Sequence, residues 1–125
     1  MNHEKVGYVD GFVMVVPTNK EKAYLEMAEV GAQVWMKHGA LDYKECIGDD
    51  IVAAEEMGML GFSKLTNLKA NETVWFSYIG YKSKAHRDEV NAKVMIEMEE
   101  LYSDMESPFE MERMSWGGFE VKVSG

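Results

Sequence analysis

Two strand-like stretches that are apolar on both of their faces most constrain the fold of this chain. In "VGYVDGFVMVVP" (6–17), one face carries Val6, Tyr8, Phe12, Met14 and Val16, and the other carries Val9, Val13 and Val15. In "TVWFSYIGY" (73–81), Val74, Phe76 and Tyr78 alternate with Trp75 and Ile79. Because side chains alternate between the two faces of a strand, each stretch predicts a strand that is covered on both sides.

A helix is predicted after each of these strands. The segment "TNKE" (18–21) has the pattern of a capping box, and apolar residues then recur at helical spacing as far as His38. Gly39 suits the left-handed end of that helix. Ser83 suits the N-cap of a second helix, whose inward positions are Val90, Val94, Met98, Leu101, Tyr102 and Met105.

The remaining stretches complete a regular alternation. Residues 40–48 and 115–123 have strand periodicity, whereas 49–72 predicts a long loop with a short strand near "LGFSKL". The order strand, helix, strand, strand, helix, strand predicts a ferredoxin-like α+β fold (βαββαβ), an antiparallel sheet with two helices on one face. We expect a single domain, 1–125, in which 1–5 form a flexible extension.

Two helices cover only one face of such a sheet, so its second apolar face needs another cover. The simplest cover is a second copy of the chain, packed sheet against sheet with two-fold symmetry. We therefore expect a homodimer.

Charge and composition narrow the possible partners. A net charge of -9 argues against the phosphate backbone of nucleic acids and against anionic membranes. No apolar run approaches the roughly 20 residues of a membrane span, and the start of the chain lacks the pattern of a signal peptide. The single cysteine fits a reducing cytoplasm.

Five stretches in order along the chain resemble one known family. They are "YVDGFV" (8–13), "HGALDYKECIGDD" (38–50), "SKAHRDEVNAKVM" (83–95), "SPFEMERM" (107–114) and "GGFEV" (117–121). They are similar to the YbaA-like proteins, the family of domain of unknown function 1428. The resemblance implies a dimeric α+β barrel. It does not indicate an activity, because no activity is known for the family. More distant barrels of this kind include cofactor-free monooxygenases, haem-degrading enzymes and stress-induced proteins. The segment 52–66 departs from the pattern of these relatives.

The polar cluster of residues 38–50 does not predict a metal site. His38 lies at a helix end, Glu45 and Cys46 point to opposite faces of a strand, and Asp49 and Asp50 suit a turn. No pair has the spacing of zinc ligands, so we expect no metal and no cofactor. Cys46 is predicted to be a small buried residue in preference to a nucleophile.

Asp10 is unusual because it lies inside an apolar strand. An ionised carboxylate buried there must be paired or must change its pKa. Arg113 is a plausible partner, since the first and last strands are neighbours in this fold. Asp10 either belongs to a buried network that sets strand register or acts as a general base in a cavity.

A second polar group is expected at the start of the second helix. Spacing brings His86, Arg87 and Asn91 near one side of the helix, where they could hold a carboxylate or an enolate. Alternatively, Arg87 pairs with Asp88 at the surface and His86 acts near the cap. Aromatic residues could line the same cavity or simply pack in the core and the interface: Trp75, Tyr78 and Trp116.

Two hypotheses of function follow. In the first, a small-molecule pocket lies between the sheet and the helices or at the dimer seam and supports cofactor-free proton abstraction or oxygenation. Its catalytic candidates are Asp10 and His86, and its substrate-binding candidates are Arg87, Asn91, Trp75, Tyr78 and Arg113. In the second, the chain is a non-catalytic structural or stress-related dimer whose buried polar groups only fix strand register.

Overall fold

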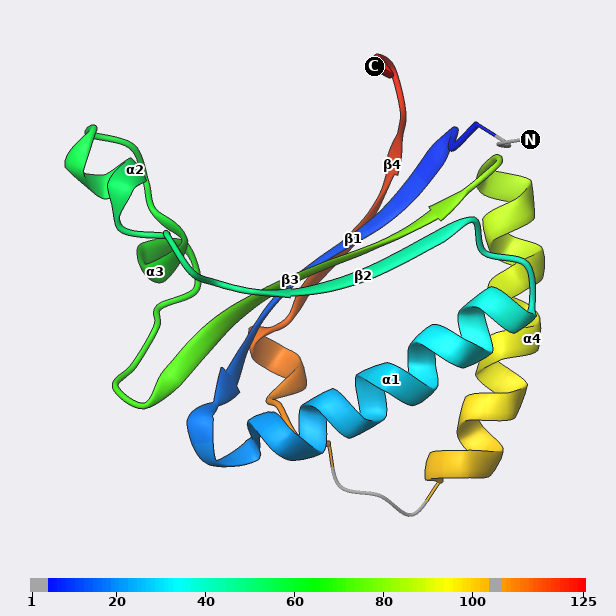
Figure 1. The fold of residues 1–125 in the computed structure, drawn as a ribbon, viewed down its shortest axis with the longest axis horizontal. Helices are drawn as coiled ribbons and strands as arrows, with labels where there is room; N and C mark the ends of the chain where they lie inside the picture. The colour runs from blue at the N-terminus through cyan, green and yellow to red at the C-terminus, as the bar shows by residue number, and fades with distance from the viewer. Residues whose placement is uncertain (1–4, 104–106) are drawn as a thin grey trace.

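The computed structural model describes residues 5–103 and 107–125 as an α+β fold built on one four-stranded antiparallel sheet (Figure 1). The strands are β1 (Tyr8–Pro17), β2 (Asp42–Ile47), β3 (Glu72–Tyr81) and β4 (Ser115–Glu120), in the order β2-β3-β1-β4. The long helices are α1 (Glu21–Lys37) and α4 (Lys84–Tyr102), and the short ones are α2 (Ala53–Glu56), α3 (Phe62–Leu65) and the 3-10 turns η1 (Thr18–Lys20) and η2 (Met111–Arg113). The predicted mixture of helices with one antiparallel sheet is confirmed.

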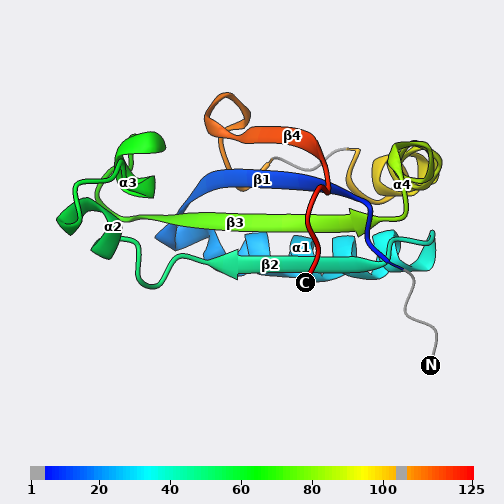
Figure 2. The ribbon, with the colours of Figure 1, turned by 90° about the horizontal axis from the view of Figure 1, so that it is seen from above.

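Helix α1 lies across one face of the sheet, which we call the helix-side face (Figures 1 and 2). Its buried residues recur along one stripe: Tyr24, Ala28, Gly31 and Val34. Tyr24 and Ala28 pack against Met14, Val16 and Trp75 of β1 and β3. Val34 packs in a second cluster with Ile79 and Tyr81 of β3. The helix ends as the sequence predicts, because His38 is its C-cap and Gly39 adopts a left-handed φ of 111°.

Helix α4 covers only the end of the same face. Ser83 is its N-cap, as predicted, and the Ser83 side chain accepts a hydrogen bond from the backbone N–H of His86. Val90 and Val94 are buried, whereas Leu101 is exposed and the predicted Met105 lies outside the described residues. The second half of α4 runs away from the strands (Figure 1), and this leaves part of the helix-side face open over β1 and β4.

Two local predictions are wrong. Thr18 does not cap α1, because the chain makes the turn η1 first and the Thr18 hydroxyl donates to the carbonyl of Asn71. The "LGFSKL" segment contains the short helix α3 and not a strand. Its backbone closes locally, with the N–H of Leu65 donating to Gly61 and that of Thr66 donating to Phe62.

The opposite face of the sheet, which we call the outer face, carries apolar side chains and no long helix (Figure 2). Val15 and Val74 are buried at one end of it, where Ile51 and Phe62 of the 49–71 segment lie beside Val74. Phe76, in contrast, is exposed. In the part of the chain that the structure describes, no helix has the length and apolarity needed to cross a bilayer.

An ion pair fastens η2 to the start of β3. The Arg113 guanidinium donates to both carboxylate oxygens of Glu72, at 2.5 and 2.9 Å, and also to the carbonyls of Thr66 and Asn67. This bidentate pair lowers the pKa of Glu72 to about 2. Arg113 thus holds the segment before β4 against the loop before β3.

We expect Glu72→Gln to destabilise the chain by about 1–2 kcal/mol at neutral pH, after allowance for solvent screening. The folded pKa of Glu72 is depressed, so its contribution is complete above the unfolded value of 4.5 and disappears as pH falls toward 2. The difference in unfolding free energy between the wild type and Glu72→Gln should therefore shrink in acid. Urea unfolding between pH 2 and 7 measures it, and a difference independent of pH would contradict the assignment.

Candidate functional site

The strand register places four side chains in one row across the helix-side face. Glu45 of β2 pairs with Ser77 of β3, Ser77 pairs with Phe12 of β1, and Phe12 pairs with Trp116 of β4. The adjacent row contains Tyr43, Ile79, Asp10 and Gly118. These two rows form the floor of the candidate site.

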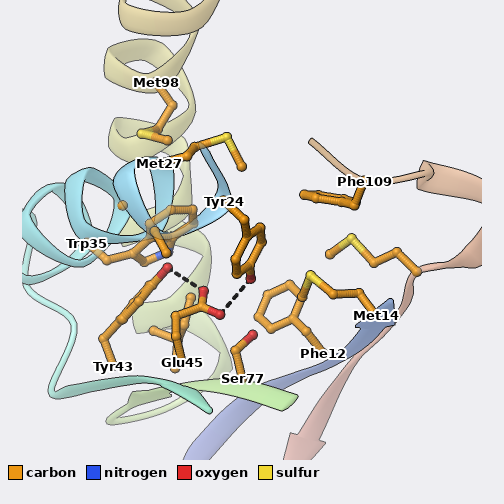
Figure 3. A pocket seen from close by; sticks show the side chains of 14 residues that line it. Phe12, Met14, Tyr24, Met27, Trp35, Tyr43, Glu45, Ser77, Met98 and Phe109 are labelled. Carbon is orange, nitrogen blue, oxygen red and sulfur yellow. Dashed lines mark hydrogen bonds between the residues drawn. The ribbon is translucent and has the colours of Figure 1, made fainter. Parts of the chain in front are cut away.

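Two adjacent cavities lie above this floor. The larger, which we call the outer cleft, has a volume of about 560 Å³ and is lined by Asp10, Phe12, Trp35, Asn91, Met95, Met111, Met114 and Trp116. The smaller, which we call the inner lobe, has a volume of about 140 Å³ and lies against Glu45, Ser77 and the residues shown in Figure 3. Phe12, Trp35 and Met114 line both, so the two cavities are adjacent.

Asp10 lies at the polar end of the outer cleft and is only 1% exposed. Its Oδ1 atom accepts a hydrogen bond of 2.7 Å from Nη1 of Arg87 on α4. The guanidinium of Arg87 also lies over the ring of Tyr8, at 5.0 Å, and near that of Trp116, at 5.9 Å. Burial raises the pKa of Asp10, and the positive charge of Arg87 opposes that rise.

Asn91 lies one turn further along α4 and connects α4 to α1 and β3. Its Oδ1 atom accepts hydrogen bonds from the indole N–H of Trp35, at 3.0 Å, and from the hydroxyl of Tyr81, at 3.2 Å. Asn91 and Tyr81 both counter the rise in the pKa of Asp10. Of the residues predicted for the pocket, the fold therefore brings Asp10, Arg87 and Asn91 together.

Glu45 is the second carboxylate of the site, at the opposite end of the floor. Its Oε2 atom accepts a hydrogen bond of 2.6 Å from the hydroxyl of Tyr24, and its Oε1 atom accepts one of 2.9 Å from Tyr43 (Figure 3). Burial raises the pKa of Glu45, and the two hydroxyl donors oppose that rise. Burial, and then the neighbouring Glu45 carboxylate, raise the pKa values of Tyr24 and Tyr43, so both phenols keep their protons.

His86 does not line either cavity. Its Nδ1 atom accepts a hydrogen bond from the backbone N–H of Lys82, and its ring packs edge-on against Tyr81. Arg87 also donates to Asp88 through Nε, so the surface pair considered as an alternative exists beside the buried one. His86 thus acts at the helix start and supports Tyr81.

Several other site predictions are corrected by the structure. Arg113 is not the partner of Asp10, because it pairs with Glu72 at the far end of β3. Trp75 is buried under Tyr24 on the helix-side face, whereas Tyr78 lies on the outer face and donates to Asp42, so the two cannot line one cavity. Cys46 is exposed and not buried.

Sequence reasoning missed the inner lobe. It predicted only that Glu45 and Cys46 point to opposite faces of the strand. Glu45 lies two residues from Tyr43 and therefore on the same face, so alternation could have placed these two side chains together. Tyr24 and Trp35 were expected only as part of the helix stripe. Among the described residues, no cluster of three or more His, Cys, Asp or Glu side chains could hold a metal ion.

Comparison with known proteins places this chain in a family. The model of the family described as "Protein of unknown function (DUF1428)" matches residues 7–111, which include the whole of the cavity floor except β4. The chain belongs to the DUF1428 family. The predicted resemblance to the YbaA-like proteins is thereby confirmed.

The relatives of this DUF1428 protein span almost all of its length. It is 41% identical over 115 residues to the uncharacterized protein YbaA of Escherichia coli strain K12, with 90% of this chain and 94% of the relative covered. The same figures apply to the uncharacterized protein YbaA of Shigella flexneri. A solved structure, the de novo designed protein Foldit4, aligns with 92% of this chain and 99% of its own at 7% identity and a TM-score of 0.45.

We expect Arg87→Met to destabilise this DUF1428 protein by about 3–5 kcal/mol, because the substitution leaves Asp10 as an unpaired buried charge. Without Arg87 the pKa of Asp10 rises further, so the variant loses stability as pH rises from 3.8 through that raised pKa. Adding Asp10→Asn to Arg87→Met should restore part of the loss at neutral pH. Denaturant unfolding of the single and double variants measures the coupling, and equal losses would show that the two side chains do not interact.

Proposed function

We propose that this protein binds a small, largely apolar and uncharged molecule in the outer cleft and inner lobe. The observation that carries the proposal is the outer cleft, whose volume of about 560 Å³ lies within the range of small-molecule sites, about 300–1,000 Å³. Its walls are aromatic and methionine side chains, with polar groups converging at Asp10 and Asn91. Such a combination is typical of ligand sites.

The charges of the cleft favour an uncharged ligand. Arg87 and Asp10 neutralise each other across 2.7 Å, so the polar end offers hydrogen-bonding groups without net charge. Methionine side chains adapt their conformation to ligands of different outline, and Met95, Met111 and Met114 line the cleft. Cofactor-free oxygenase- or isomerase-like chemistry would need a base at this floor, and the raised pKa values of Asp10 and Glu45 suit proton transfer.

A neutral fluorescent dye tests whether the outer cleft binds apolar molecules. We expect Nile red to bind and Trp116→Ala to weaken binding about tenfold, since an aromatic wall of the cleft is lost. Phe119→Ala is the matched control, because Phe119 lies on the same strand with similar exposure, 61% against 57%, but on the outer face. Loss of Nile red binding in Phe119→Ala and not in Trp116→Ala would contradict the proposal.

We also propose that the sheet has the ferredoxin-like arrangement and that two copies associate through their outer faces as a dimeric α+β barrel. The strand order β2-β3-β1-β4 with antiparallel neighbours supports the arrangement. The exposed Phe76 and Phe119 on the outer face support the association.

Two segments beside the outer face favour a second copy as its cover. The 49–71 segment extends beyond one end of the sheet (Figure 1) and exposes apolar side chains: Met57, Met59, Leu60 and Leu65. The C-terminal residues 121–125 extend from the sheet on the same side (Figure 1), with Val123 exposed. In a two-fold dimer each of these segments could pack against the partner and bury this apolar surface.

Sedimentation equilibrium tests the dimer. We expect the wild type to sediment as a dimer and Phe76→Glu to sediment as a monomer, because a carboxylate in the sheet-to-sheet contact would be buried without a partner. Leu25→Glu is the matched control, since Leu25 on α1 is 45% exposed and Phe76 is 44% exposed. A monomeric wild type, or a dimer that survives Phe76→Glu, would contradict the proposed interface.

One observation favours the alternative, a non-catalytic dimer in which polar groups only fix strand register. The charge of Asp10 is already paired with that of Arg87, whose Nη1 donates to Oδ1 of Asp10. If the dimer forms while Nile red fails to bind, this second function replaces the first.

A further inference from the structure

The floor of the inner lobe carries a serine hydroxyl that faces the cavity. Ser77 is 3% exposed and lines the lobe. Within residues 5–103 and 107–125, its hydroxyl forms no hydrogen bond, and its oxygen is accessible from the lobe. A hydroxyl that faces a cavity in this way is free to pair with a polar atom of a molecule bound there. Ser77 therefore indicates a polar atom of a ligand above the centre of the floor.

Glu45 lies next to Ser77 in the same row, and its carboxylate can accept further hydrogen bonds. Each of its carboxylate oxygens accepts one hydrogen bond, from Tyr24 or from Tyr43, and each can accept another. Among the described residues Glu45 has no ion pair, in contrast to Asp10. Figure 3 shows the Glu45 carboxylate and the Ser77 hydroxyl turned toward the same space. The pair thus offers an acceptor and a hydroxyl side by side.

The remaining walls fit one aromatic ring. The volume of the lobe, about 140 Å³, is close to the roughly 150 Å³ of an apolar cavity that holds a single benzene ring. Phe12 and Phe109 provide ring faces and edges, while Met27 and Met98 place sulfur atoms against the same space (Figure 3). Contacts between sulfur and an aromatic ring, and between aromatic rings, are favourable.

We propose that the inner lobe binds a hydroxylated aromatic ring whose hydroxyl donates to Glu45 and accepts from Ser77. This inference rests on the proposed function, since the outer cleft would hold the rest of a larger ligand beyond Phe12 and Trp35. A hydroxyl satisfies both neighbours because it is a donor and an acceptor. A carboxylate would be repelled by Glu45, and an ammonium would leave buried donors unpaired among the apolar walls.

Calorimetric titration with phenol, toluene and benzylamine tests the inference. We expect phenol to bind at least about tenfold more tightly than toluene, which lacks the hydroxyl. Ser77→Ala should reduce this preference about two- to tenfold, and Glu45→Gln should reduce it further because the stronger, charged acceptor is lost. Glu26→Gln, a change at an exposed position of α1, is the matched control and should leave the preference unchanged.

Three results would overturn the inference. Equal affinities for phenol and toluene would show that the hydroxyl is not recognised. A phenol preference that survives both Ser77→Ala and Glu45→Gln would place the ring elsewhere. Tighter binding of benzylamine than of phenol, lost in Glu45→Gln, would assign the lobe to a cation.

Nile red separates this inference from the proposed function, because the dye is larger than the inner lobe and reports on the outer cleft. Nile red binding without phenol binding overturns the inference and leaves the proposed function standing. Phenol binding with the expected response to Ser77→Ala, but without Nile red binding, supports the inner lobe and overturns the role of the outer cleft. Failure of both ligands overturns both.

Discussion

The ion pair between Asp10 and Arg87 fixes the relation between the central strand β1 and helix α4, and the candidate site depends on that relation. Few side chains of α4 are buried, chiefly Val90 and Val94, so apolar packing alone holds the helix weakly. A buried charge pair adds a strict geometric requirement. A shift of α4 by one turn would move Arg87 away and leave the buried carboxylate of Asp10 without a cation. Since α4 then runs away from the strands, the outer cleft remains open beside the pair.

The sequence predicted those features that depend on neighbours along the chain. Strand periodicity located β1 and β3, Ser83 located the start of α4, and Gly39 located the end of α1, because alternation and capping are local. The partner of Asp10 could be either Arg87 or Arg113, and both are far from Asp10 along the chain. The local sequence pattern therefore does not indicate which arginine pairs with Asp10. Trp75 and Tyr78, however, are three residues apart on one strand, so alternation alone implies that they lie on opposite faces of the sheet.

The two carboxylates of the floor have different roles because their surroundings differ. In an antiparallel sheet, neighbouring strands lie about 4.8 Å apart and residues rise about 3.4 Å, so Glu45 and Asp10, two strands and two residues apart, are separated by roughly 12 Å between Cα atoms. Asp10 is held by a cation, and Glu45 only by the neutral hydroxyls of Tyr24 and Tyr43. A ligand that spans the floor would therefore meet a neutralised pair at one end and an acceptor at the other.

Strand register does not require either carboxylate. The pairing of β1 with β3 extends over all ten residues of each strand, so many residue pairs besides that of Asp10 contribute to the register. Placing Asp10 in this pairing costs desolvation, which its raised pKa reflects, and brings no register information that Phe12 and Met14 lack. Ser77 makes no hydrogen bond among the described residues, so the sheet does not depend on its hydroxyl. Asp10 instead contributes to the fold through its pair with Arg87, which positions α4 against β1.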